Sequence, residues 1–310
     1  MAAAYESLAA AEARGNLEIA LEARKWVVTA ALEGGDMATV DAQIELYARD
    51  AGSLKQPTFS YYTHVLRAMR SMMAGDFEAA AGEIATTRAF LERTDNGNAR
   101  MHYQTQSFWL AVLTGDFSVV APFIDEARGR YAPFGPFVDM HVLGVDAVRG
   151  TWDPSVLTAT FVAFPRNFLW SWGMTIAASL AGLLGDAESS RRIYGLLLPH
   201  AADIAVTGPA VTCDGARMHY LGVMAAAFGE LDLAVSHMED AIIMNDRIGA
   251  RPLAALSRQS LAGILLTRAG VADSSRAAEL GREALRESRA LRMAPLERLS
   301  AQLLDALEPG

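Results

Sequence analysis

Few residues of this sequence have the types and spacing that enzyme chemistry requires. Cys213 is the one cysteine of the chain, and no histidine is its neighbour in the sequence to hold it as a reactive thiolate. The sequence lacks His-Glu-x-x-His, Gly-x-Ser-x-Gly, Cys-x-x-Cys and Gly-x-Gly-x-x-Gly, the patterns of zinc, serine-nucleophile, dithiol and dinucleotide chemistry. We therefore predict no catalytic residues, no cofactor and no enzymatic activity.

Three of the six histidines raise the question of a metal site. His64, His102 and His141 recur about 40 residues apart, close to a repeat period. Each lies at a different distance from the glycine that follows its helical segment, so the three side chains point to different sides of their helices. They cannot surround one ion tetrahedrally, and we predict no metal site.

The elements that must position any site are helices. A glycine, an acidic residue and an apolar residue recur between apolar helical segments, about 35 to 45 residues apart. The glycine ends one helix in the left-handed conformation, and the acid caps the next helix. The copies begin at Gly35, Gly75, Gly115, Gly185 and Gly229, with degenerate copies at Gly150 and Gly270.

Small residues precede several of these turns by two helical turns, where neighbouring helices pack closely: Ala68, Ala178, Gly222 and Gly263. In this respect the repeats resemble the tetratricopeptide repeat. We predict an all-α fold, an α-α superhelix of about seven helical hairpins that forms a single domain over residues 1–310. A degenerate, aromatic-rich repeat is expected at about 131–172 and a closing helix at 295–307. No strand is predicted, and residues 201–214, with Gly208-Pro209, are expected to form a long loop.

The concave face of a helical solenoid is its usual binding surface. In a tetratricopeptide-like array, three positions on the first helix of each pair face that groove. Those positions carry aromatic side chains, neutral hydrogen-bonding groups and one lysine, which suits a peptide or a small polar effector better than a highly charged ligand. A groove filled by packing or water is the alternative. The groove residues that we select are Lys25, Tyr62, Met69, His102, Trp109, Trp172, Thr175 and His219.

The aromatic residues between Tyr131 and Trp172 allow two interpretations. Aromatic side chains at helical spacing usually fill a core, here to complete a degenerate repeat. They also line ligand clefts. The sequence leaves both open.

The charges favour a cytoplasmic protein without nucleic-acid or membrane contacts. The net charge is −9, and the 27 basic residues, of which only Lys25 and Lys55 are lysines, are mixed with 36 acidic ones. Such a surface has no basic stripe for a phosphate backbone. The longest apolar stretch is too short to cross a bilayer, and one cysteine fits a reducing compartment.

A second resemblance covers about residues 15 to 307. The segments 21–26, 165–170, 193–200, 220–222, 228–232, 241–245 and 248–252 are similar to the C-terminal helical-repeat region of large bacterial LuxR-type regulators, and of adenylate-cyclase-like proteins that carry a signalling P-loop ATPase module. This resemblance implies a regulatory role. The phosphate-binding sequence Gly-x4-Gly-Lys-Ser/Thr is absent and too few residues follow Leu307 for a helix-turn-helix. The chain is therefore expected to be the sensor region of a longer regulator or a free-standing relative.

We expect a regulatory sensor that binds a protein segment or small effector in its groove. The alternative is a structural scaffold that forms homo-oligomers through an end helix such as 295–307. A third hypothesis, an α-helical toroid enzyme, lacks the repeated acids at helix starts that it would need.

Overall fold

The glycine-acid turns end one helix and begin the next, as their chemistry requires. In a computed structural model of the chain, which describes residues 2–120 and 170–307, the glycines of all five intact copies have positive φ, from 63° at Gly185 to 90° at Gly229. The side chains of Asp36, Asp76 and Asp186 each accept a hydrogen bond from the backbone N–H three residues later. These turns are determined locally.

Three turns differ from the prediction. After Gly115, the Asp116 carboxylate accepts the backbone N–H of Ser118, two residues later, and no helix begins among the described residues up to 120. The side chain of Glu230 caps no N–H of the helix that follows it, because that N-cap has no side-chain hydrogen bond. At the degenerate copy near Gly270, the residue in the left-handed conformation is Ala269, with φ 55°. Gly150 lies outside the described residues.

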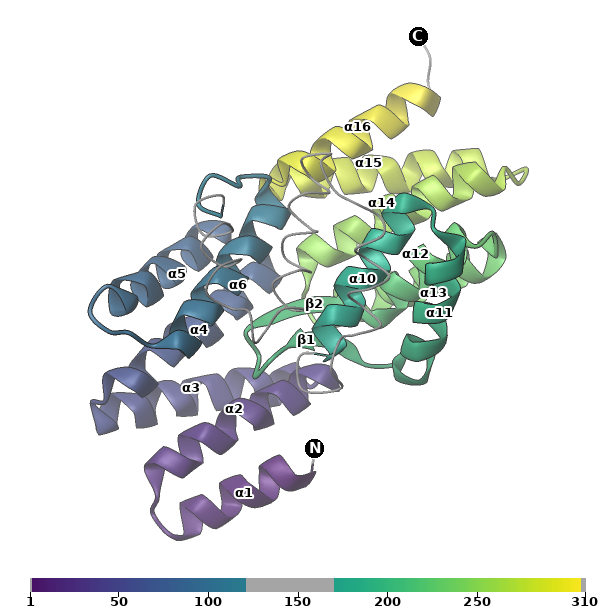
Figure 1. Ribbon diagram of the computed structural model, residues 1–310. Coiled ribbons are helices and arrows are strands. Elements are labelled where there is room, and N and C mark those ends of the chain that lie inside the picture. Colours follow the sequence, from purple (N-terminus) through teal and green to yellow (C-terminus); the bar gives the residue numbers. More distant parts are fainter. Residues whose placement is uncertain (1, 121–169, 308–310) are drawn as a thin grey trace.

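The described residues form thirteen α-helices, one 3₁₀ turn and two strands (Figure 1). In chain order they are α1 (Ala2–Ala13), α2 (Leu17–Glu33), α3 (Met37–Leu54), α4 (Pro57–Ala74), α5 (Phe77–Leu91), α6 (Gly97–Thr114), α10 (Trp170–Leu184), α11 (Ala187–Leu197), η2 (Leu198–His200), β1 (Ile204–Thr207), β2 (Thr212–Ala216), α12 (Arg217–Ala227), α13 (Leu231–Arg247), α14 (Arg251–Arg268), α15 (Asp273–Leu291) and α16 (Ala294–Leu307).

Helices that follow one another closely in the chain pack against each other, so the fold is an all-α superhelix of helical hairpins, as predicted. The array curves until distant members meet: α14 contacts α4, and α16 contacts α6 (Figure 1). The predicted closing helix corresponds to α16. The aromatic-rich repeat predicted at 131–172 lies outside the described residues, apart from the first turn of α10.

The prediction of no strands was wrong. The expected loop, residues 201–214, and the two residues after it contain an antiparallel hairpin, in which Ile204 pairs with Ala216 and Thr207 with Thr212. The hairpin lies in the centre of the superhelix, between α4 and α6 on one side and α10, α12 and α13 on the other (Figure 1). Both strands are fully buried, which is why a segment without helical periodicity has a fixed structure here.

One hydrophobic core cluster passes through the hairpin and joins the two ends of the array. It combines Tyr62 and Leu66 of α4 with Ile204 and Val206 of β1, and continues to Leu291 at the end of α15. The two strands therefore fill the space around the axis of the superhelix, which the helices alone would leave open.

Glycines of the first turns are also contact points for the C-terminal helices. A Cβ atom at Gly75 would lie 2.5 Å from Cδ2 of Leu291, and one at Gly115 would lie 2.9 Å from Cγ of Pro295. The same two residues need a positive φ of 81° and 85°. Glycine is therefore required at these positions both by the turn and by the close approach of α15 and α16.

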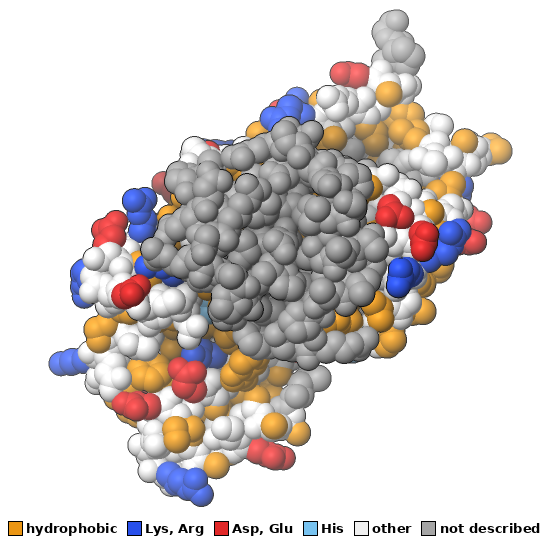
Figure 2. Space-filling model, viewed as in Figure 1, with side chains coloured by type: hydrophobic (Ala, Val, Ile, Leu, Met, Phe, Trp, Pro, Cys, Tyr) orange, Lys and Arg blue, Asp and Glu red, His pale blue; other side chains and the backbone are white. Residues whose placement is uncertain are grey.

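Over the described residues, none of the helices combines the length and the apolar character that a membrane span requires. On the face drawn in Figure 2, acidic and basic side chains of the described residues are interspersed.

Candidate functional site

The strongest candidate site in the described part of the chain is a half-enclosed cavity of about 460 Å³ beside the central hairpin. It lies where α6, α10, β2, α12 and α14 meet, and most of its wall is apolar or aromatic. Its described lining residues are Thr105, Phe108, Trp109, Val112, Trp172, Thr175, Ile176, Ser179, Gly182, Thr212, Asp214, His219, Tyr220, Val223, Leu256 and Ser260. The volume is in the range of small-molecule sites.

Half of the groove residues selected from the sequence meet at this cavity. Trp109 comes from α6, Trp172 and Thr175 come from α10, and His219 comes from α12. The helical periodicity brings them together, because each lies on the inner face of its helix, and the superhelix points those faces toward one axis.

The other four selected residues lie elsewhere. Met69 is fully buried in the core, and the Tyr62 hydroxyl donates a hydrogen bond of 2.6 Å to the carbonyl of Pro209 at the hairpin tip. The Lys25 ammonium lies 4.5 Å from the centre of the Tyr62 ring and pairs with Glu22. His102 packs edge-on against Tyr62. The hairpin tip therefore lies against the inner face of α4, where Tyr62 is located.

Asp214 is the charged residue of this candidate site that the sequence analysis did not select. It was assigned to the end of a loop, yet it lies on β2, lines the cavity and is 5% exposed. A signal was present: β-branched residues flank Gly208-Pro209 on both sides, at Val206-Thr207 and Val211-Thr212, and this pattern is typical of a hairpin.

The Asp214 carboxylate is held by two hydroxyls. Thr207 Oγ1 donates to Oδ2 at 3.0 Å and Thr212 Oγ1 donates to Oδ1 at 2.9 Å. Burial raises the pKa of Asp214 to about 6, although the hydrogen bonds from Thr212 and Thr207 and the charge of Arg217 oppose this rise. At neutral pH the cavity therefore contains a desolvated, mostly ionised carboxylate.

A chain of hydrogen bonds fixes the ring of His219. Ser257 Oγ donates to the carbonyl of Leu253 at 2.8 Å, and it lies 3.0 Å from His219 Nδ1 and 3.2 Å from Asn245 Nδ2. Asn245 Oδ1 accepts the backbone N–H of Ala216 at 2.9 Å, so its Nδ2 faces Ser257. Burial lowers the pKa of His219 to about 4, so the ring is neutral at pH 7.

The hairpin is tied to α4 and α6 by one buried side chain. Gln106 Nε2 donates to the carbonyls of Val65 and Val211, at 2.7 and 2.8 Å. We expect Gln106→Ala to lower the free energy of unfolding by about 2 to 3 kcal/mol, because two buried carbonyls lose their donor and a cavity forms.

Urea denaturation would measure this loss, with Gln104→Ala, on the same helix but less buried, as the control. A loss for Gln106→Ala no larger than for the control would contradict this role of Gln106.

Cys213 lies on β2 and is buried, and burial raises the pKa of its thiol to about 12. The thiol is thus protonated and unreactive at neutral pH, as expected for a packed side chain. Among residues 2–120 and 170–307, no three His, Cys, Asp or Glu side chains are grouped as metal ligands would be. His141 lies outside these ranges.

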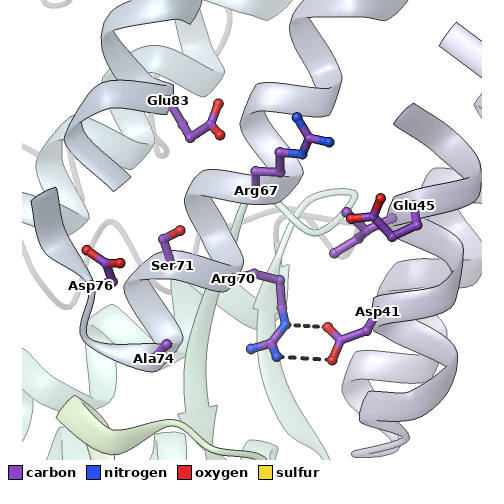
Figure 3. Close-up of a pocket in the computed structure, with 9 residues that line it drawn as sticks. Asp41, Glu45, Arg67, Arg70, Ser71, Ala74, Asp76 and Glu83 are labelled. Atoms are coloured by element: carbon purple, nitrogen blue, oxygen red, sulfur yellow. Dashed lines mark hydrogen bonds and ion pairs between the residues drawn. The ribbon is translucent and has the colours of Figure 1, made fainter. Parts of the chain in front are cut away.

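A second cleft, of about 410 Å³, lies between α3, α4 and α5 (Figure 3). Arg70 donates two hydrogen bonds to Asp41, of 2.6 and 3.2 Å, and Glu83 pairs with His64 at 2.6 Å. The charges that line it are thus largely satisfied within the protein, and it opens to solvent. We regard it as a surface feature.

Comparison with known proteins adds no assignment: no protein-family description matches the chain, and no curated protein is similar to it.

Proposed function

We propose that this chain is the effector-binding sensor module of a bacterial regulator, and that it binds a small organic effector in the cavity between α6, α10, β2, α12 and α14. The observation that carries the proposal is the cavity itself. Side chains from five separate elements meet around about 460 Å³ of space, with aromatic walls and a few polar groups. This combination is typical of sites for small ligands.

The position of the hairpin favours a small effector over a peptide. A peptide in the groove of a helical solenoid needs an open concave face, whereas here β1 and β2 occupy the centre of the superhelix. The hairpin tip is bonded to α4 through Tyr62, and Val211, the residue before β2, is bonded to α6 through Gln106. The space that remains suits a compact molecule.

The same hairpin offers a route for a signal. Thr212 and Asp214 of β2 line the cavity, and Val211, one residue before β2, is bonded to Gln106 of α6. An effector that moves β2 would change how α4 and α6 lie against the C-terminal helices. Small rotations of packed helices are a known form of such transmission.

The sequence resemblances support this proposal. The repeats resemble tetratricopeptide repeats, and the segments named above are similar to the helical-repeat region of LuxR-type regulators. A cytoplasmic sensor that passes its state to an ATPase or output domain would fit both resemblances.

We expect Trp109→Ala and Trp172→Ala each to weaken effector binding by about 100-fold or more, since each removes a large aromatic wall. A thermal-shift screen of cytosolic metabolites against the full chain would identify the effector, because a ligand that binds only the folded state raises the melting temperature. Isothermal titration calorimetry would then compare the variants.

Trp26→Ala is the matched control, because Trp26 lies on α2, is 39% exposed and does not line the cavity. Circular dichroism would check that each variant is folded. Folded Trp109 and Trp172 variants that bind the effector as tightly as the parent protein would rule out this cavity as the site.

The scaffold hypothesis has one observation in its favour. Leu299 of α16 is 52% exposed, whereas Leu296 is buried and Leu303 packs within the chain. If α16 mediates homo-oligomers, Leu299→Glu would reduce the sedimenting mass. An unchanged mass would leave α16 as an internal closing helix.

A further inference from the structure

Four polar residues of the cavity wall, Thr175, Ser179, His219 and Asp214, present hydrogen-bond acceptors, and this property, together with the proposed function, points to the class of effector. The hydroxyl of Thr175 donates to the carbonyl of Trp172 at 2.7 Å, and that of Ser179 donates to the carbonyl of Thr175 at 2.9 Å. Both hydrogens are thus used by the backbone of α10. The oxygens of these side chains keep their lone pairs for another donor.

His219 is an acceptor for the same reason. The Ser257 hydrogen is donated to Leu253, so the bond between Ser257 Oγ and His219 Nδ1 requires the proton to be on Nδ1. The neutral ring then has an unprotonated Nε2, which has no hydrogen-bond partner among the described residues. His219 is one of the residues that line the cavity.

Asp214 adds negative charge beside these acceptors. It is the one carboxylate among the described lining residues, and none of those residues is a lysine or arginine. Arg217 is the cation whose charge acts on Asp214, but it also interacts with Asp203 and Glu33 and forms no direct ion pair with Asp214. The carboxylate keeps unused lone pairs, because each oxygen accepts one hydroxyl.

The remaining wall is aromatic and apolar. Phe108 and Trp109 on α6 and Trp172 on α10 line it, with Ile176 and Val223 between the polar groups. Aromatic faces attract cations as well as apolar surfaces. A carboxylate or phosphate ligand would meet Asp214 without a compensating side-chain cation in the described wall, and desolvated like charges repel strongly.

We infer that the effector is a compact organic amine, with a protonated nitrogen that donates hydrogen bonds to Asp214 and His219 and an aromatic or branched aliphatic body that packs against Trp109 and Trp172.

Three probes with one common indole body test this inference: tryptamine, which is an ammonium ion at pH 7.5, tryptophol, which is neutral, and indole-3-acetate, which is an anion. Their binding to the full chain would be measured by isothermal titration calorimetry at pH 7.5. We expect tryptamine to bind at least about 10-fold more tightly than tryptophol, and indole-3-acetate to bind most weakly, as the loss of one charge-assisted hydrogen bond predicts.

The variant that tests the charge is Asp214→Asn, which keeps the size of the side chain. We expect it to reduce tryptamine affinity by about 10-fold and to change tryptophol affinity by less than about 3-fold, so that the preference for the amine disappears. Asp273→Asn is the control, since Asp273 is also a 5% exposed acid but is bonded to Arg268, away from the cavity. It should leave the ratio of tryptamine to tryptophol affinity unchanged.

Two results would overturn the inference: tightest binding of indole-3-acetate, or tryptamine affinity that Asp214→Asn leaves unchanged. Weak binding of all three probes would overturn it as well. The amine inference can fail while the proposed function still holds. This is the case if the metabolite screen finds a ligand of another class whose binding depends on Trp109 and Trp172. That function fails separately, when no metabolite of any charge class binds in a manner that depends on these two residues.

Discussion

Gly215→Ala is expected to lower the free energy of unfolding by about 2 to 5 kcal/mol. Gly215 has a φ of 84°, where an alanine costs about 1 to 2 kcal/mol. A Cβ atom there would also lie 2.8 Å from Cδ1 of Leu253 and 2.9 Å from Oδ1 of Asn245. Overpacking of this kind adds about 1 to 3 kcal/mol.

The effect would extend to the candidate site. Gly215 follows Asp214 directly, and Asn245 must stay in place to bond both Ala216 and Ser257. Gly229→Ala is a matched control, because Gly229 has a similar φ of 90° but no atom within 4 Å of the added Cβ. Urea denaturation of both variants would separate the two costs, because both variants carry the backbone strain of an alanine at positive φ, but only Gly215→Ala adds a steric overlap of the new Cβ atom. Equal losses for the two variants would contradict the proposed crowding at the base of the hairpin.

The second large effect that we expect is a loss of stability in acid. Burial, with a contribution from Lys25, lowers the pKa of His102 to about 3, and burial lowers that of His219 to about 4. As the pH falls through 6.5, these histidines take up protons in the unfolded chain but not in the folded protein. The unfolded state then binds more protons, so stability decreases until the pH reaches the folded pKa values.

Asp214 acts in the opposite direction. Its folded pKa of about 6 lies above that of an exposed aspartate, so between pH 6 and about 4 the folded state binds the extra proton and gains stability. The two histidines outweigh it. We expect a net loss of about 2 kcal/mol between pH 7 and pH 5, since one pKa unit corresponds to about 1.4 kcal/mol.

Thermal denaturation at pH 7, 6 and 5 would measure this loss. A variant with both His102→Gln and His219→Gln should lose this dependence, and the remaining contribution of Asp214 should make it slightly more stable at pH 5 than at pH 7. If the double variant does not fold, the two single variants can be measured instead. Each should remove about half as much of the pH dependence of stability as the double variant would. A parent protein whose melting temperature is constant from pH 7 to pH 5 would contradict the burial of these two rings.

Local signals in the sequence were sufficient for the helical architecture. Glycine followed by aspartate ends one helix and caps the next through bonds that span at most a few residues, and Gly35-Asp36, Gly75-Asp76 and Gly185-Asp186 do so in the structure. The inner face of each helix also follows from the periodicity. For this reason Trp109, Trp172, Thr175 and His219 could be selected before their spatial relation was known.

The hairpin and the cavity were decided by tertiary structure. The segment from Ile204 to Ala216 is too short to be stable as an isolated hairpin, and its strands persist because helices from both ends of the array bury them. Once the hairpin occupies the centre, Tyr62 bonds to its tip and Asp214 enters the wall of the cavity. These contacts join residues more than a hundred positions apart, and no local pattern encodes them. The sequence by itself thus determined the helices and the faces that they turn inward. Only long-range packing decided which of the inward-facing residues line the cavity and which are buried in the core.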